Sequence, residues 1–231
     1  MSEPHPLDDP SSRFARLKAT CAQDWDAYVN HEFVRRLGDG TLPEASFRHY
    51  LIQDYLFLVH FARAWALAVV KADTLDDMRA ASASVHALLE IEMSLHVKYC
   101  EGWGLSEADI LSADEATDNM AYTRFVLERG FSGDVLDLRV ALAPCGLGYA
   151  AIGRTLAASP DTVKEGNPYL DGINMYAGDE FQQHASAELA RLDEIAARRS
   201  GEARFPELAM TFRQATRLEA RFWSMGLELS S

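Results

Sequence analysis

Apolar residues recur every three to four positions along almost the whole chain, and this spacing is the period of an α-helix. Runs of alternating or β-branched residues, which would predict strands, are missing. The pattern predicts a first helix over about residues 12–37 and a second over about residues 43–72. A third helix is predicted over about residues 75–101, with Thr74 and Asp77 as its N-terminal cap.

Turn-forming residues divide the rest of the chain into helices of roughly 15–30 residues. The breaks fall at residues 112–114, 130–133, 159–160, 166–168 and 200–201. We therefore expect an all-α fold, a bundle of about seven or eight helices. Since no linker or internal repeat divides the sequence, residues 11–231 are expected to form a single domain after a loose N-terminal arm over residues 1–10.

Composition and charge exclude several classes of protein. Hydrophobic residues make up 48% of the 231 residues and charged residues 25%, which is ordinary for a globular protein, and no run of about 18 apolar residues predicts a membrane span. The first residues are acidic and proline-rich, unlike a secretory signal, so we expect a cytoplasmic protein. A formal charge of -13 repels phosphate backbones, so no nucleic-acid partner is expected.

One predicted helix contains helix-disfavouring residues around Cys145. Its apolar period continues through Pro144, although a proline inside a helix removes a backbone donor and costs about 3 kcal/mol. Gly146 and Gly148 weaken the same turns. Such conflicts concentrate at functional sites, and Tyr149 lies one turn later on the Cys145 face, where its hydroxyl can lie beside the thiol. A kinked core helix with a buried, inert thiol is the alternative.

Asp54 interrupts a helix face that is otherwise aromatic. A carboxylate on such a face is costly unless another group satisfies it, so Asp54 is a candidate functional residue. The aromatic residues of this face are Tyr50, Phe57, Phe61 and Trp65. Because aromatic residues at helical spacing are usually core residues, their pattern alone does not indicate a binding site.

A second carboxylate, Glu219, shares a stripe with Phe222 and Trp223 near the C-terminus. The stripe favours a carboxylate in an aromatic environment, where it could carry a proton. A surface ion pair with Arg217 or Arg221 is the alternative.

Four sequence blocks in this order resemble the TenA family, also called thiaminase II or aminopyrimidine aminohydrolase. They are YLIQDYLFL, PCGLGY, NPYLDGINMYAGDEF and LEARFW, and the resemblance spans about residues 9–229. It implies a helical fold similar to haem oxygenase, assembly as a homotetramer, and no cofactor or metal. The implied activity is hydrolysis of a C–N bond in 4-amino-5-aminomethyl-2-methylpyrimidine, or in thiamin itself, to give hydroxymethylpyrimidine in thiamin salvage.

The resemblance also implies a role for each matching residue. The family's nucleophile matches Cys145, and its acid/base glutamate matches Glu219. Its substrate-ring aspartate matches Asp54, a third catalytic candidate that could act as a base or orient the ring amine. The positions that bind the substrate match Phe57, Tyr122, Tyr149 and Tyr176. Many members have a tyrosine in place of Phe57, and its hydroxyl helps to activate the thiol. Phe57 can stack on a pyrimidine but cannot supply that hydrogen bond.

Other classes of function stay open from the sequence. Three pairs at i, i+4 spacing could bind metal in a haem-oxygenase-like di-iron oxidase, although such pairs are more often solvated; they are His86/Glu90, Glu92/His96 and Glu180/His184. His60 could bind haem, but a lone histidine is more often a hydrogen-bonded core residue. A non-catalytic pyrimidine-binding protein is a further alternative. A regulatory role would have to be indirect, because no basic recognition helix is present.

Overall fold

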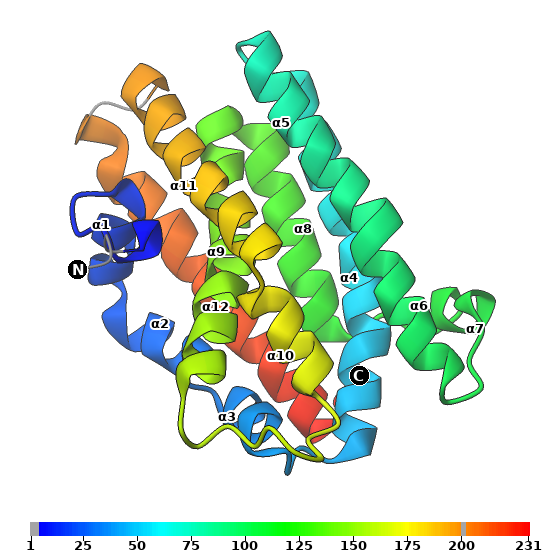
Figure 1. Cartoon of the computed structure of the whole chain (residues 1–231). Coiled ribbons are helices and arrows are strands. Elements are labelled where there is room, and N and C mark those ends of the chain that lie inside the picture. The colour runs from blue at the N-terminus through cyan, green and yellow to red at the C-terminus, as the bar shows by residue number, and fades with distance from the viewer. Residues whose placement is uncertain (1–4, 200–201) are drawn as a thin grey trace. The chain divides into compact units, whose positions relative to one another are not determined.

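The computed structural model describes residues 5–199 and 202–231 (Figure 1). All regular elements in these ranges are helical, and the ranges contain no β-strand, which confirms the predicted all-α class. Residue contacts divide the chain into two compact units. Unit 1 comprises residues 1–42 and 139–223, and unit 2 comprises residues 43–138 and 224–231.

Unit 1 is built from the N-terminal helices up to residue 42 and from the helices between residues 139 and 223. Helix α1 packs against α2 and α11, while α10 packs against α3 and α11. Two longer helices, α9 and α12, have most of their residues in this unit. The bounds are α1 (Arg13–Thr20), α2 (Ala22–Val29), α3 (Glu32–Asp39), α9 (Val135–Ala158), α10 (Leu170–Ala177), α11 (Asp179–Arg199) and α12 (Phe205–Glu228).

Unit 2 is organised around one long aromatic helix, α4. Figure 1 shows α4 beside α5 and α8, and α4 also contacts α6 and α7. A π-helical turn at Ala87–Glu92 joins α5 to α6. The bounds are α4 (Glu44–Lys71), α5 (Leu75–His86), α6 (Met93–Glu101), α7 (Glu107–Leu111) and α8 (Thr117–Ser132).

The helix predicted over residues 12–37 is divided in the structure into α1, α2 and α3. The predicted start is correct, because the Ser12 hydroxyl accepts the Ala15 N–H at 3.1 Å. The backbone leaves the helical region at Cys21, with φ -138°. At the next break, the His31 ring accepts the Phe33 N–H at 3.1 Å and caps α3. Since all three short helices bury apolar side chains in unit 1, their periodicity does not reveal the breaks.

The predicted cap of the third helix is confirmed, because the Thr74 hydroxyl accepts the Asp77 N–H at 3.1 Å. The helical run that follows is continuous through residues 75–101, but its middle is the π-helical turn. More and shorter helices therefore form among the described residues than the number expected from sequence breaks.

Helix α9 is long and apolar enough to cross a membrane by length and composition, with a mean hydropathy of 1.5. However, 78% of its most apolar window is buried inside the protein. Such burial is typical of the core helix of a globular protein.

Of the arm predicted over residues 1–10, residues 1–4 lie outside the described part of the chain. The following residues include a 3-10 turn, Pro6–Asp8, in which Leu7 is buried. The Asp8 carboxylate pairs with both terminal nitrogens of Arg154 on α9, at 2.7 and 2.9 Å.

Candidate active site

Helix α9 continues through Pro144, and the structure shows what occupies the weakened turns. The Tyr28 hydroxyl donates a hydrogen bond to the Pro144 carbonyl at 3.2 Å. Gly148 lies directly against the Tyr28 ring, so any side chain at this position would overlap the ring. Pro144 and Gly148 therefore lie at a close approach between α9 and Tyr28, on the turns that carry Cys145.

The three cysteines differ in accessibility. Cys21 and Cys100 are buried, and burial raises the pKa of both thiols, although nearby arginines oppose the shift. Cys145 is half-buried. A thiol must be reachable and able to ionise in order to act as a nucleophile, so Cys145 is the best candidate of the three.

Aromatic rings connect α9 to neighbouring helices of unit 1. Tyr149 contacts Tyr176 with ring centroids 4.9 Å apart, and it contacts Trp223 on α12 at 5.3 Å. Trp223 also stacks on Phe33 at 4.9 Å and on Tyr28 at 6.4 Å. The structure thus brings two predicted substrate-binding tyrosines, Tyr149 and Tyr176, into contact with each other.

Glu219 is buried, with only 2% of its surface exposed. Glu219 therefore lies in the interior and not at the surface, whereas Arg217 and Arg221 are exposed. Glu219 lies one turn before Trp223, just as Cys145 lies one turn before Tyr149. The contact between Tyr149 and Trp223 therefore joins the helix faces that carry the predicted nucleophile and the predicted acid/base group.

A glutamine and a glycine hold the segment that carries Tyr176. The Gln182 amide donates to the backbone carbonyls of Ala150 at 2.9 Å and Tyr176 at 2.6 Å. A side chain at Gly153 would come within 2.7 Å of Tyr176. Helix α9 and the end of α10 can approach this closely because residue 153 has no side chain.

In unit 2, Asp54 is buried and hydrogen-bonded. Its Oδ2 accepts the Tyr50 hydroxyl at 3.2 Å and lies 2.7 Å from His96 Nε2. The other ring nitrogen of His96 lies 2.8 Å from the Glu92 carbonyl. Burial lowers the pKa of His96, but the hydrogen bond and charge of Asp54, together with Glu92, outweigh it and raise the pKa overall. The polar partners that Asp54 requires on an aromatic face are therefore Tyr50 and His96.

The predicted ring-binding side chains Phe57 and Tyr122 contact each other in unit 2, with centroids 5.0 Å apart. Phe57 also stacks on Phe61 at 5.1 Å. All three rings are buried. Phe57 and Phe61 therefore also serve as core residues, as the aromatic spacing of α4 indicates.

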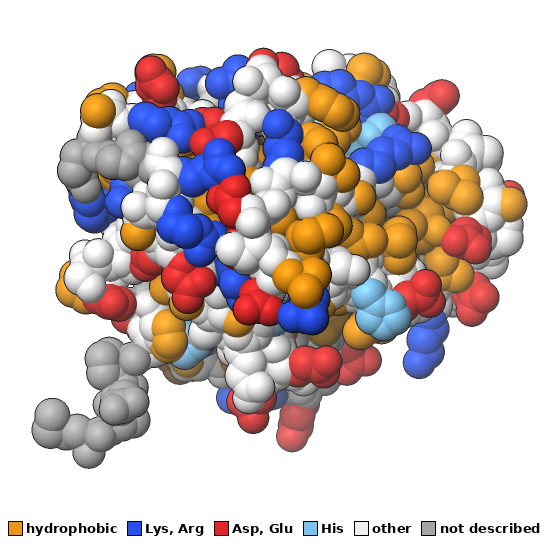
Figure 2. Space-filling model, turned by 90° about the horizontal axis from the view of Figure 1, so that it is seen from above, with side chains coloured by type: hydrophobic (Ala, Val, Ile, Leu, Met, Phe, Trp, Pro, Cys, Tyr) orange, Lys and Arg blue, Asp and Glu red, His pale blue; other side chains and the backbone are white. Residues whose placement is uncertain are grey.

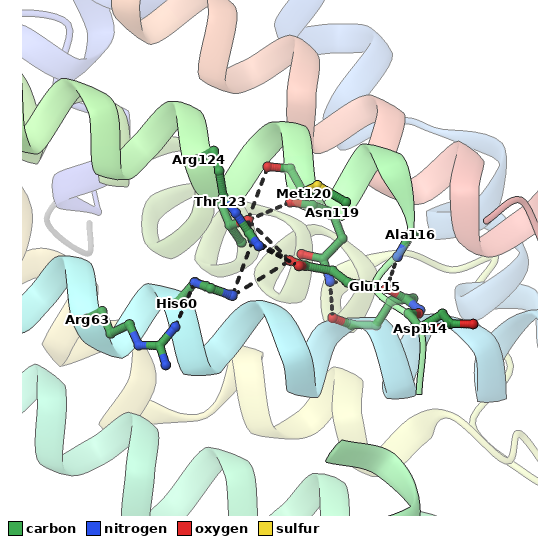
Figure 3. A network of polar contacts seen from close by, with 10 residues as sticks. His60, Arg63, Asp114, Glu115, Ala116, Asn119, Met120, Thr123 and Arg124 are labelled. Atoms are coloured by element: carbon green, nitrogen blue, oxygen red, sulfur yellow. Dashed lines mark hydrogen bonds and ion pairs between the residues drawn. The ribbon is translucent and has the colours of Figure 1, made fainter. Parts of the chain in front are cut away.

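A side-chain clamp fixes α4 against the start of α8, next to Asp54. The Gln53 amide donates to the Asp114 carbonyl at 2.9 Å and accepts the Ala116 N–H at 2.9 Å. Asn119 donates to the Gln53 carbonyl at 2.8 Å. Figure 3 shows Asp114, Ala116 and Asn119 close together in this network. Because Gln53 immediately precedes Asp54, the clamp also fixes the backbone that positions the carboxylate.

His60 belongs to an outer part of the same network (Figure 3). Its two ring nitrogens lie 3.1 Å from Arg63 and 3.2 Å from Arg124. Arg124 in turn forms two hydrogen bonds with Glu115, at 2.6 and 2.7 Å. His60 is therefore hydrogen-bonded, as the more common interpretation expects, but it is half-buried and not a core residue.

The three candidate metal pairs do not form a metal centre among the described residues. Two of the pairs, His86/Glu90 and Glu180/His184, are exposed. In the third pair, His96 is directed to Asp54. Within the described ranges, no group of three His, Cys, Asp or Glu residues is placed to hold a metal ion.

Several of these contact residues do not stand out in the sequence. His96 is singled out only as half of a metal-like pair, while Tyr28, Gln53 and Gln182 have no distinctive local pattern. The sequence points to Tyr28 only indirectly. A glycine at position 148 indicates that another residue approaches α9 closely, but it does not identify that residue. Asp54 likewise indicates that a buried partner must exist.

The helical architecture belongs to the haem-oxygenase-like fold class. A Shewanella denitrificans domain with a heme oxygenase-like fold gives a TM-score of 0.66 at 14% identity, covering 93% of this chain and 92% of that chain. This likeness concerns the fold alone.

Matches of higher sequence identity, together with a family model, show the family of the chain. Residues 19–229 match the model of the TENA/THI-4/PQQC family. A protein of Halalkalibacterium halodurans named aminopyrimidine aminohydrolase is 36% identical over 202 residues, which is 87% of this chain and 89% of that protein. A Silicibacter structure described as a TenA family transcription regulator is 46% identical with a TM-score of 0.89, covering 98% of this chain and 99% of that chain. The chain therefore belongs to the TENA/THI-4/PQQC family, as the sequence blocks predicted.

Proposed function

We propose that this protein is an aminopyrimidine aminohydrolase of thiamin salvage. It hydrolyses the bond between the methylene carbon and the amine of 4-amino-5-aminomethyl-2-methylpyrimidine, or the corresponding bond of thiamin. The observation that carries the proposal is the half-buried Cys145 on the proline- and glycine-containing turns of α9, in a chain similar to a protein named for this activity.

The chemistry requires a nucleophile and a proton donor. The amine on the ring methylene is a poor leaving group until the pyrimidine becomes electron-rich. The Cys145 thiolate adds to a ring carbon beside a ring nitrogen while Glu219 protonates that nitrogen, which breaks the aromaticity of the ring. Electrons then flow from the ring to the methylene carbon and expel the leaving group, which departs as ammonia when the aminomethyl group enters in its ammonium form.

Water completes the reaction. It adds to the exposed methylene carbon and loses a proton, which gives the hydroxymethyl group. Loss of the Cys145 sulfur and of the ring-nitrogen proton restores the aromatic ring, so the sum is one amine and one water converted into one alcohol and one ammonia. The partial exposure of Cys145 and the burial of Glu219 support these two roles.

The remaining predicted residues recognise the ring. Asp54 accepts hydrogen bonds from the ring amine, and the aromatic side chains stack on or border the pyrimidine. These side chains are Phe57, Tyr122, Tyr149 and Tyr176. Support comes from the hydrogen-bonded burial of Asp54 in unit 2 and from the ring contacts within each unit. With Phe57 in place of a tyrosine, activation of the thiol does not use a hydroxyl at this position.

We also propose that the protein is a cytoplasmic homotetramer. Figure 2 shows hydrophobic side chains on the viewed surface between charged ones. In unit 2, Val70, Leu75 and Phe131 are 79%, 59% and 72% exposed. Lys71 of α4 donates to the Gly133 carbonyl at 2.7 Å, so the ends of α4 and α8 that carry Val70 and Phe131 are adjacent. Burial of such side chains against another subunit is favourable. Light scattering should show a tetramer that dissociates in the Phe131→Asp variant, and a monomeric wild type would contradict this proposal.

The activity is tested with the purified wild-type protein. It is incubated separately with 4-amino-5-aminomethyl-2-methylpyrimidine and with thiamin, and hydroxymethylpyrimidine is quantified by chromatography. The proposal expects equal amounts of hydroxymethylpyrimidine and ammonia from the first compound, and the ratio of the two rates identifies the preferred substrate. Absence of product from both compounds would contradict it.

A further inference from the structure

His96 and Asp54 form a buried pair between two helices of unit 2. His96 lies on α6 and Asp54 on α4, and they are 3% and 4% exposed. His96 Nε2 and Asp54 Oδ2 are 2.7 Å apart. A buried carboxylate is costly unless a partner compensates its charge, so the histidine determines the state in which Asp54 is stable.

The hydrogen-bond partners of His96 define its protons. Nδ1 lies 2.8 Å from the Glu92 carbonyl, which can only accept, so Nδ1 carries a proton. Nε2 faces an oxygen of Asp54 that also accepts the Tyr50 hydroxyl. Two donors at one oxygen are typical of a carboxylate, and a neutral imidazole has only one N–H. The geometry therefore fits a doubly protonated His96 beside an ionised Asp54.

The titratable groups whose charges act on His96 favour the same state. They are Asp54 on α4 and Glu92 at the end of the π-helical turn, and both raise the pKa of His96 against the effect of burial. The π-helical turn ends at Glu92, one helical turn before His96. Such turns often occur next to functional residues because they change the direction of the side chains that follow.

The second oxygen of Asp54 is left for another donor. Both hydrogen bonds to the carboxylate go to Oδ2, and Oδ1 accepts none from the part of the chain that the structure describes. Asp54 and Phe57 lie three residues apart on one face of α4. A planar ring stacked on Phe57 could thus present an N–H group to Oδ1.

We propose that His96 is a positioning residue that holds Asp54 as a carboxylate through Oδ2, so that Oδ1 accepts an N–H of the substrate's ring amine. This inference rests on the proposed function, because it takes the ring amine as the donor. It gives His96 a part in specificity. A 4-aminopyrimidine donates a hydrogen bond to the carboxylate, whereas a 4-oxopyrimidine places an acceptor oxygen opposite it and is rejected.

The protonation of His96 is measured directly on the wild-type protein by proton–nitrogen correlation spectra of the histidine side chains. His96→Gln serves to assign the signal. The expected result is an imidazolium with two protonated nitrogens at neutral pH, with a transition above about pH 6.5. A neutral His96 ring at neutral pH would overturn the inference, whatever the enzymatic activity.

Ligand recognition is measured by calorimetry with hydroxymethylpyrimidine, which has the 4-amino ring but no leaving group, and with its 4-oxo counterpart. Glutamine at position 96 retains a donor but no charge, so His96→Gln should weaken binding of the 4-amino ring about tenfold and reduce the preference over the 4-oxo ring. The control His86→Gln replaces an exposed histidine of α5 and should bind as the wild type does.

In turnover assays, the His96→Gln substitution should raise KM more than it lowers kcat, and it should change the pH dependence of KM. Equal binding by wild type and His96→Gln, or an equal loss for both rings, would indicate a merely structural role and overturn the inference. If the wild type binds the 4-amino ring but does not turn over the substrate, the proposed function fails while the His96 inference survives.

Discussion

The cluster around Cys145 in unit 1 and the cluster around Asp54 in unit 2 differ in how their polar groups are held. In unit 1, a half-buried thiol and a buried carboxylate lie on helices joined by aromatic contacts. In unit 2, two donors fix a carboxylate, and one of them is a histidine whose pKa is raised. The difference fits separate roles, the chemical step in unit 1 and ligand recognition in unit 2. A group that forms covalent bonds must be accessible, whereas a group that recognises a ligand is more selective when it is held in place.

The largest expected effect is on Cys145. Cys145→Ser should reduce kcat by roughly a thousandfold or more, because the hydroxyl is a far poorer nucleophile at neutral pH. Cys21→Ala is the control, since Cys21 is buried and burial raises the pKa of its thiol. Steady-state assays per folded molecule check both variants. Full turnover by Cys145→Ser would show that Cys145 is not the nucleophile and that unit 1 does not supply it.

Glu219→Gln should lower kcat by about a hundredfold to ten-thousandfold, because the amide cannot transfer the proton. Binding of hydroxymethylpyrimidine should change much less than kcat. Assays of kcat together with calorimetric Kd values separate the two effects. An unchanged kcat would exclude proton transfer by Glu219.

Asp54→Asn should act mainly on recognition. It replaces one acceptor oxygen by a donor and leaves His96 without its charge partner, so kcat/KM should fall roughly a hundredfold. The loss should be larger in KM than in kcat, in contrast to Glu219→Gln. A loss confined to kcat would show that Asp54 takes part in the chemical step, and the contrast between the two units would disappear.

The glycines of α9 test how the Cys145 turns are built. Gly148→Ala forces the Tyr28 ring to move and should lower the free energy of unfolding by about 1–3 kcal/mol. Gly146→Ala is the matched control. The added methyl group would lie more than 4 Å from the neighbouring helices and side chains of the described residues, and alanine favours a helix. Urea unfolding of both variants measures the difference. Equal stability would contradict the close approach of Tyr28.

The smallest expected effect is the pH dependence of the Asp54–His96 pair. The pKa of His96 is raised in the folded state, so its stabilising contribution is fully present below the unfolded value near 6.5 and disappears as the pH rises through the folded value. The difference in free energy of unfolding between wild type and His96→Gln should therefore shrink as the pH rises from about 6 towards 9. A constant difference would mean that the pair does not depend on the charge of His96.

Much of the fold could be predicted because its signals are local. The helical period along the chain and the Thr74 cap depend on residues close in sequence, and both predictions are confirmed. The breaks at Cys21 and Asn30 could not be found in this way, because the apolar period continues across them.

The candidate site was predictable only as a set of unusual residues. Asp54 and Pro144 stood out because each conflicts with its own helix, but their partners are remote in sequence: His96 is 42 residues from Asp54, and Tyr28 is 116 residues from Pro144. Only the folded chain identifies such partners. The catalytic roles of Cys145 and Glu219 stay predictions until they are assayed.

The central claim is that the Cys145 thiol acts on a bound pyrimidine, and alkylation tests it most directly. The wild type is treated with a limiting amount of iodoacetamide, with and without hydroxymethylpyrimidine, and modification is mapped by peptide mass spectrometry while activity is followed. The account predicts that Cys145 reacts before the buried Cys21 and Cys100, that activity falls in proportion to its modification, and that the pyrimidine protects it. Full activity after complete alkylation of Cys145 would contradict the account.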